Sequence, residues 1–330
     1  MSRRYVNQLN HGDSVEEAFL VTDKQLRVNR QGGLYLGVEL RDKTGCVQGR
    51  LWNATEEQAR RFDVGDFLHV KGKTQLFQGS LQIIISQLEP LDPSSQPTEE
   101  FVPQPKEGSD RLLGRLREIL MRMTNPYLRG LIECFLIDDE FLKKFLMAPA
   151  GVKNHHAYHG GLIEHVVAVL HLADRVAELY PEIDRDLLLS GVFLHDIAKV
   201  NELSFDRGFG YSDEGQLVGH LVMGVEMLTE KAAACAKLMD EPFPAELLLR
   251  LKHMIVSHHG THEFGSPKLP MTLEAVVLHY LDNLDAKIHS YSREINDDPS
   301  DSNWTPFQQA LGRRLYKGSQ AAKEPVGLES

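Results

Sequence analysis

Residues 187–200 read Leu-Leu-Leu-Ser-Gly-Val-Phe-Leu-His-Asp-Ile-Ala-Lys-Val. Apolar side chains at three- and four-residue spacing predict a buried helix over this stretch. The adjacent pair His195-Asp196 offers an imidazole and a carboxylate from one backbone segment, and Lys199 follows it. A polar pair of this kind in an apolar helix indicates a helical domain with a metal ion in its interior.

The same periodicity continues on both sides of this stretch and predicts an all-α bundle after residue 110. Asn125-Pro126 is a typical helix start, and Pro181 is a typical stop. The predicted helices cover residues 112–123, 128–136, 162–179, 187–200, 217–238, 245–257 and 273–289.

Histidine is concentrated in this helical half, where eleven of the fifteen histidines fall between residues 155 and 262. A single histidine on a helix is more often a packing or surface residue than a ligand, but imidazoles and carboxylates from several helices together predict a metal site. Such a set holds one or two divalent ions, and its histidine content favours Mn, Fe, Co or Zn over Mg. The predicted metal ligands are His165, His195, Asp196, His220, His258, His259 and Asp282. A site of this type usually activates water for hydrolysis.

The segment ahead of His165 adds a further polar feature. His156 is predicted to lie on the substrate side and to take part in catalysis. The pair Gly160-Gly161 directly precedes a predicted helix, and its N–H groups either receive a phosphate or only form a tight entry into the helix.

The first ninety residues have a different pattern, with short β-branched or alternating runs separated by turn signals. Predicted strands cover residues 18–28, 34–40, 47–52, 67–70 and 81–86, and a short helix covers 55–61. Five strands with a helix after the third predict a small Greek-key barrel of the OB type. The fold class is therefore multidomain, with an OB-type barrel followed by an all-α bundle.

A proline-rich stretch separates these two patterns and indicates a linker. The predicted limits are residues 1–90 for the barrel, 91–110 for the linker, 111–317 for the bundle and 318–330 for a disordered tail. The sequence contains no run of eighteen apolar residues, so we expect no membrane span. The first residues lack the apolar core of a secretory signal, so we expect no such signal there. The three cysteines show no pairing pattern, so we expect a cytoplasmic protein.

Charge and aromatic residues suggest what the barrel binds. The net charge of −11 argues against an indiscriminate nucleic-acid binder, yet residues 15–90 are neutral, with ten Lys/Arg and ten Asp/Glu. OB barrels stack bases of single strands on aromatic side chains while nearby cations contact phosphates. The predicted binding residues are Tyr35, Trp52, Phe77, Arg27, Arg50, Lys71 and Lys73. The alternative is that Tyr35 and Trp52 fill the barrel core.

The spacing of the ligand candidates resembles the HD-domain metal-dependent phosphohydrolase superfamily, which has a His, a His-Asp pair and a distal Asp. This resemblance implies one ion held by His165, His195, Asp196 and Asp282, and a second held by Asp196, His220, His258 and His259. It also implies that Asp196 and Lys199 act in catalysis, with Lys199 contacting phosphate. The alternative for Lys199 is a lysine favoured by the dipole at a helix C-terminus. Asp285 and His279 are candidates only for indirect support of the ligands.

The order of barrel, linker and histidine-rich bundle resembles the YhaM-type 3′→5′ exoribonucleases. Shared segments include residues 40–45, 160–165, 194–199, 257–260 and 281–287. The resemblance implies a Mn-dependent phosphodiesterase that trims single-stranded RNA from its 3′ end to nucleoside monophosphates with metal-activated water. The residues alone do not choose between RNA and DNA, nor do they give the oligomeric state.

Two further functions are compatible with the residues. One is a nucleotide phosphohydrolase for small substrates, which would need no barrel. The other is a non-catalytic single-strand binder whose bundle is a scaffold, although a scaffold would not be expected to keep every ligand position. A cyclic-dinucleotide phosphodiesterase of the HD-GYP kind is disfavoured because residues 258–260 read His-His-Gly and residues 265–267 read Gly-Ser-Pro.

Overall fold

The structure is a computed structural model that describes residues 3–29, 32–77, 80–97, 100–101, 107–152, 158–205, 209–296, 298, 300, 302–309 and 311–318. The chain divides into two compact units, which are described separately. One consists of Met1–Asp63, Phe67–Gln96 and Lys287–Ser330, and the other of Val64–Asp66 and Pro97–Ala286. Within the described residues, no helix is both long enough and apolar enough to cross a membrane.

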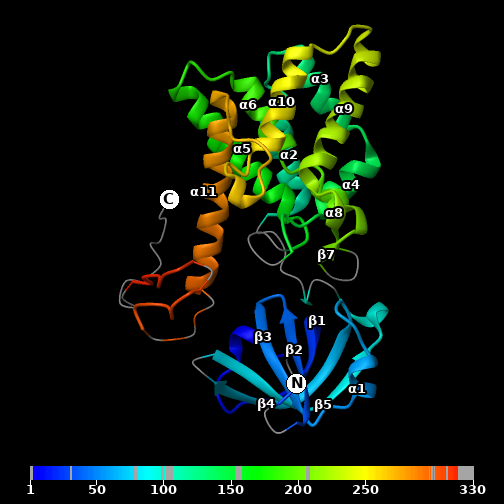
Figure 1. Cartoon of the computed structure of the whole chain (residues 1–330), viewed down its shortest axis with the longest axis vertical. Coiled ribbons are helices and arrows are strands. Elements are labelled where there is room, and N and C mark those ends of the chain that lie inside the picture. The colour runs from blue at the N-terminus through cyan, green and yellow to red at the C-terminus, as the bar shows by residue number, and fades with distance from the viewer. Residues whose placement is uncertain are drawn as a thin grey trace, which may run out of the picture. The chain divides into compact units, whose positions relative to one another are not determined.

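The N-terminal strands form a closed five-stranded barrel with the order β1-β2-β3-β5-β4 (Figure 1). The strands are β1 (Ser14–Val28), β2 (Leu34–Asp42), β3 (Gly45–Trp52), β4 (Phe67–Phe77) and β5 (Ser80–Leu91). The pairing of β3 with β5 is parallel and the other pairings are antiparallel. Helix α1 (Glu56–Arg60) lies between β3 and β4 in the chain, and Thr55 caps its N-terminus. These features confirm the predicted OB-type barrel.

Alternation of side chains explains why these segments close into a barrel. In β2, Leu36, Val38 and Leu40 are buried while the residues between them are only partly buried. The period of two therefore directs one face of the strand inward, where it joins a single apolar core. Strands β4 and β5 run well beyond their predicted ends, because they pair with each other along their whole length, from Phe67↔Leu91 to Phe77↔Ser80.

The second unit is helical and contains one large apolar core. Its helices are α2 (Ser109–Leu120), α3 (Pro126–Leu136), α4 (Asp139–Met147), α5 (Gly161–Leu179), α6 (Arg185–Leu194), α7 (Lys199–Glu202), α8 (Asp213–Leu217), α9 (His220–Met239), α10 (Ala245–Ser257) and α11 (Leu273–Asn296). Helix α6 is buried along most of its length, and α5 is buried mainly over its N-terminal half. The predicted all-α bundle is confirmed.

The helices differ from the sequence prediction at three places. The stretch 187–200 is not one helix, because a turn at residues 195–198 separates α6 from α7. The stretch 217–238 is also broken, since Gly219 has a positive φ of 79° just before α9. Helix α4 was not predicted, although Asp138 caps it and Phe141 and Phe145 bury one face. A two-stranded hairpin of β6 (Leu203–Ser204) and β7 (Gly210–Tyr211) follows α7.

Candidate metal centre

The structure brings all seven predicted ligands together in the helical unit. They form three overlapping groups, each with ligand atoms within 4.8 Å of one another: His165, His195 and Asp282; His195, Asp196 and His258; His220, His258 and His259. The ligands come from α5, the turn after α6, the first residue of α9, the end of α10, and α11. The break between α6 and α7 contributes to this convergence, because adjacent residues of a continuous helix point about 100° apart.

The first group consists of His165, His195 and Asp282, and both of its histidines are fully buried. His165 Nε2 lies 3.3 Å from both His195 Nε2 and Asp282 Oδ1. The distance from His195 Nε2 to Asp282 Oδ1 is 3.9 Å. Three ligand atoms therefore surround one point, as a bound cation requires.

Asp196 lies between this group and the second one. Its Oδ2 is 3.4 Å from His195 Nε2, and its Oδ1 is 3.6 Å from Nε2 of both His220 and His258. Oδ1 is buried and has no hydrogen-bond partner among the described residues. A buried carboxylate oxygen without a donor is costly, so this atom fits a metal ligand. The two oxygens of Asp196 thus face different histidines, His195 on one side and His220 with His258 on the other.

The five histidines share one arrangement of their ring nitrogens. In each, Nδ1 lies 2.7–2.9 Å from an oxygen that can only accept a hydrogen bond. The partner is a carboxylate for His165 (Asp285) and His220 (Glu202), and a backbone carbonyl for His195, His258 and His259. Nδ1 therefore carries the proton, and Nε2 is directed to the centre as a lone-pair donor.

Facing lone pairs give the centre its affinity for positive charge. His220 Nε2 and His259 Nε2 are 3.2 Å apart, and burial together with His220 lowers the pKa of His259. Two neutral imidazoles cannot hydrogen-bond through two acceptor nitrogens, so a cation between them relieves the repulsion. The donor set of imidazole and carboxylate suits divalent transition metals, and the residues present fit such ions.

Apart from His165, the pKa values of the buried groups agree with this interpretation; His165 lies between two carboxylates and would hold a proton at Nε2 as well until a cation displaces it. Burial acts to raise the pKa of Asp196, but Lys199 and His195 outweigh it and hold that pKa well below its usual value. The pKa of Asp282 is also lowered, because His165 and His195 outweigh burial. Burial lowers the pKa of His258 to about 4, whereas the hydrogen bonds of His165 with Asp282 and Asp285 overcome burial and raise its pKa to about 10. The carboxylates are thus charged at neutral pH.

Lys199 and the entry to α5 complete the surroundings of the centre. Lys199 Nζ lies 2.6 Å from Asp196 Oδ2 and 2.7 Å from the carbonyl oxygen of Ala150. The N–H groups of Gly160 and Gly161 donate to backbone carbonyls, which favours the tight helix entry over the phosphate site. His156 lies outside the described residues.

Sequence reasoning missed Glu202 as a part of this centre. Its carboxylate is buried at the end of α7 and accepts hydrogen bonds from the backbone N–H and Nδ1 of His220. No spacing in the sequence points to Glu202, because its role depends on the approach of α7 to α9. Asp285 and His279 are the two residues predicted to support the ligands indirectly. Asp285 contacts Nδ1 of His165, and His279 Nδ1 lies 2.8 Å from the carbonyl oxygen of His258.

In the barrel unit, four of the predicted binding residues form two pairs of neighbours. Tyr35 and Trp52 are register partners on β2 and β3, with ring centroids 5.2 Å apart. The Arg50 guanidinium lies 5.1 Å from the centroid of the Phe77 ring. Trp52 and Phe77 are 42% and 43% exposed, and Tyr35 is half-buried, so none of the three fills the barrel core.

The other three basic residues predicted to bind phosphates, Arg27, Lys71 and Lys73, differ in their surroundings. Arg27 and Arg50 line one hollow of the barrel surface with Tyr35. Lys71 forms an ion pair with Glu16 at 2.7 Å. Lys73 is exposed and shares a row of the sheet with Arg50, because both are register partners of Ile84 on β5.

Comparisons with known proteins agree with both units. A model of the HD domain matches residues 162–287, and a model of the OB-fold nucleic acid binding domain matches residues 20–91. The 3′-5′ exoribonuclease YhaM of Bacillus velezensis is 34% identical over 285 residues, which are 86% of this chain and 88% of that protein. The chain belongs to the YhaM family. YhaM of Bacillus subtilis is 33% identical over the same shares, and YhaM of Shouchella clausii is 31% identical over 96% of this chain and 97% of its own. The predicted resemblance is confirmed.

Proposed function

We propose that this YhaM-family chain is a metal-dependent 3′→5′ exoribonuclease that degrades single-stranded RNA to nucleoside monophosphates. One observation carries the proposal: the unpaired Oδ1 of Asp196 faces two imidazoles while Oδ2 faces a third. A non-catalytic scaffold has no use for such a costly arrangement. Membership of a family whose relatives are named 3′-5′ exoribonucleases supports the direction and the substrate.

The proposed metal sites follow the groups of neighbouring ligands. His165, His195, Asp196 and Asp282 would hold one ion, and Asp196, His220, His258 and His259 would hold the other. Bound divalent ions supply activated water and stabilise charge on the phosphoryl oxygens. We propose Mn as the metal because the resemblance to the YhaM-type enzymes implies it; the histidine-rich ligation by itself disfavours Mg but also suits Fe, Co or Zn.

Other residues have proposed roles around the ions. Asp196 would hold both ions, and Lys199, which donates to Asp196 and to the carbonyl oxygen of Ala150, would provide positive charge for the phosphate. His156 stays a sequence-based proposal for the substrate side. The proposed domain limits are residues 1–90, 91–110, 111–317 and 318–330, and the proposed location is the cytoplasm.

The barrel would hold the strand while the helical unit cuts it. Tyr35, Trp52 and Phe77 offer ring faces to bases, and Arg50, Lys71 and Lys73 offer charge to phosphates. The pairing of Lys71 with Glu16 makes it the weaker of these charges. A barrel on a small-molecule hydrolase would have no such purpose, which favours a polymeric substrate.

The test is incubation of the full chain and Mn²⁺ with RNA and DNA oligomers labelled at the 5′ end. A ladder that shortens from the 3′ end, with release of nucleoside monophosphates from RNA, is expected. The Asp196→Ala variant should give no ladder, whereas Asp110→Ala, at an exposed acid of α2, should act as wild type. Undiminished turnover in Asp196→Ala would refute the site, and cleavage of DNA alone would refute the substrate.

A further inference from the structure

Gly37 lies in the middle of β2, where a glycine weakens a strand because it contributes no side chain to packing. Its register partners are Gln25 on β1 and Arg50 on β3, so it sits in the centre of a three-stranded part of the sheet. Glycine in such a place needs a reason. It often marks a point where a ligand approaches the backbone closely.

Packing does not supply that reason. A Cβ at Gly37 would lie 3.7 Å from the carbonyl oxygen of Gln25 and 4.0 Å from the Tyr35 ring, which are ordinary contacts. Gly49 on β3 shows the contrast, because a Cβ there would lie 2.8 Å from Ile85 and 2.9 Å from Val38. Gly49 is thus required by the crowded barrel core, whereas a Cβ would fit at Gly37.

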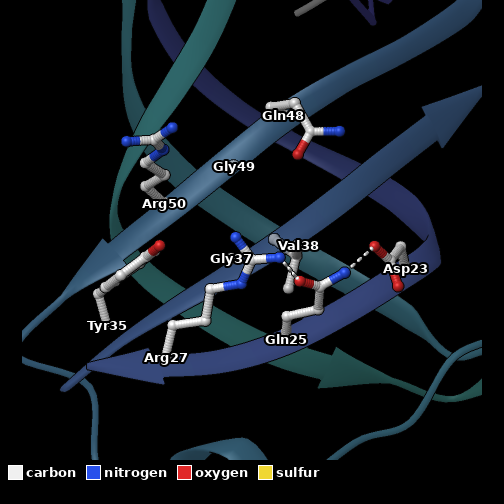
Figure 2. Close-up of a pocket in the computed structure, with 9 residues that line it drawn as sticks. All are labelled: Asp23, Gln25, Arg27, Tyr35, Gly37, Val38, Gln48, Gly49 and Arg50. Atoms are coloured by element: carbon white, nitrogen blue, oxygen red, sulfur yellow. Dashed lines mark hydrogen bonds between the residues drawn. The ribbon is translucent and has the colours of Figure 1, made fainter. Parts of the chain in front are cut away.

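The missing side chain at Gly37 leaves a hollow of about 150 Å³ on the barrel surface (Figure 2). Its lining includes Gln25, Arg27, Tyr35, Gly37, Gln48 and Arg50. Figure 2 shows Gln25 between its two hydrogen-bond partners, since it donates to Asp23 and accepts from Arg27. These hydrogen bonds link three side chains along one wall of the hollow.

The chemistry of the hollow favours a flat ligand with an attached anion. The backbone groups of β2 are already paired with β1 on one side and β3 on the other, so the floor offers no cluster of free N–H groups to a phosphate. The Tyr35 ring, with Trp52 beside it, forms an aromatic wall. Arg27 and Arg50 place two positive charges at the edge, against the one carboxylate of the lining, Asp23.

We propose that the hollow above Gly37 is a subsite for one nucleobase of the bound single strand, with the flanking phosphates at Arg27 and Arg50. The inference rests on the proposed function, because it assumes that the barrel holds the strand. Gln48 provides a polar group at the rim, and its Nε2 donates to Glu39 Oε2 at 3.1 Å. The absence of a side chain at position 37 is then what admits the base.

The test fills the hollow without damaging the strand, using the Gly37→Val variant of the full chain. Valine has a high strand propensity, so the melting temperature should stay the same or rise. Binding is measured by fluorescence anisotropy in an Asp196→Asn background, which prevents degradation of the probes. The probes are a uridine 12-mer and a 12-mer of abasic ribose phosphates. Gly45→Ala, where a Cβ would lie 3.6 Å from Val6, is the matched control.

We expect Gly37→Val to weaken binding of the uridine 12-mer about tenfold, the usual effect of losing one stacked base. Binding of the abasic 12-mer should be unchanged, and Gly45→Ala should bind both probes as the unsubstituted background does. Equal losses on both probes, or no loss on either, would overturn the base subsite while leaving the exoribonuclease proposal intact. If the unsubstituted background bound neither probe, the proposed role of the barrel would fail, and the subsite with it.

Discussion

Glu202 and His220 are joined by two hydrogen bonds to one oxygen. Oε1 of Glu202 accepts from the backbone N–H of His220 at 3.0 Å and lies 2.8 Å from its Nδ1. The carboxylate thereby satisfies the first N–H group of α9 and also sets the tautomer and orientation of the imidazole. At the opposite side of the centre, Asp285 does the same for the ring of His165, at 2.7 Å from Nδ1. Each proposed ion therefore has one imidazole that is backed by a carboxylate.

Replacing Glu202 by glutamine should weaken metal binding by about 10- to 100-fold, the usual effect of losing a carboxylate behind a histidine ligand. Glutamine can still accept a hydrogen bond, so the fold of α9 should survive while the negative charge is lost. Calorimetric titration of the metal-free chain with Mn²⁺ measures this directly. Glu230→Gln, at an exposed position of α9, is the control. Equal affinity in Glu202→Gln and wild type would show that Glu202 serves only the helix end.

Asp285→Asn should also weaken metal binding about 10- to 100-fold, but at the other ion. Because Asp285 supports His165 and Glu202 supports His220, each variant should weaken one of two binding steps. In the double variant both steps should be weak, and the two losses should add. A single binding step in wild type, or a double variant no worse than either single one, would contradict two separately supported ions.

The sequence pointed to the candidate metal ligands more clearly than to the residues that hydrogen-bond to them, and the reason is physical. Histidines and aspartates in several apolar helical runs are conspicuous together, so His165, His195 and Asp282 could be proposed as ligands from their joint occurrence and from the family resemblance. Glu202 looks like any acid near the end of a helix until the fold brings α7 against the start of α9. The predicted continuous helix over 187–200 was wrong because periodicity does not reveal the turn that separates α6 from α7.

The barrel, like the metal centre, could be predicted from the sequence only in part. Alternating apolar residues predicted the strands, but not the full lengths of β4 and β5, which pair with each other from Phe67↔Leu91 to Phe77↔Ser80. Tyr35 and Trp52 had two open interpretations because an aromatic residue in a strand can face either side. Only the register, which pairs them on the outer surface, distinguishes between these interpretations.

Lys199→Met should separate catalysis from metal binding. Activity should fall about 100- to 1,000-fold, as when one charge-stabilising donor is lost from a hydrolytic site. Mn²⁺ affinity should be unchanged or higher, because a positive charge 2.6 Å from Asp196 is removed. The paired measurements are turnover of labelled RNA and calorimetric Mn²⁺ titration, with Lys143→Met at an exposed position as control. Parallel loss of affinity and activity would assign Lys199 a structural role.

Glu274 at the start of α11 should make a contribution to stability that depends on pH. Burial acts to raise its pKa, but hydrogen bonds from its own N–H, the N–H of Asp184 and Arg250 outweigh burial and lower it. Because the folded-state pKa lies below the unfolded value of about 4.3, this contribution is present above that pH and is lost as the pH falls through the folded-state value.

Glu274→Gln should therefore reduce the free energy of unfolding at pH 7 by about 2 kcal/mol, less than for a fully buried pair because Arg250 is partly exposed. The deficit should shrink when urea unfolding is repeated near pH 4. Glu246→Gln, at an exposed site on α10, should show no deficit at either pH. A deficit that is constant with pH would mean that lost packing, not the charge, is responsible.

The two tryptophans of the chain allow a matched test of the barrel surface. Trp52 is 42% exposed beside Tyr35, and Trp304 is 46% exposed beside Tyr316, with ring centroids 5.2 and 5.0 Å apart. The two residues are thus alike in exposure and in aromatic contact, and differ in whether they lie on the barrel surface proposed to bind the strand. Trp52→Ala should cost about 1–3 kcal/mol of binding to a single-stranded RNA 12-mer, the range for loss of one stacking platform. Trp304→Ala should leave binding unchanged. Equal losses would mean that the strand contacts both aromatic pairs, and a loss only in Trp304→Ala would remove the β2–β3 surface from the proposed path of the RNA.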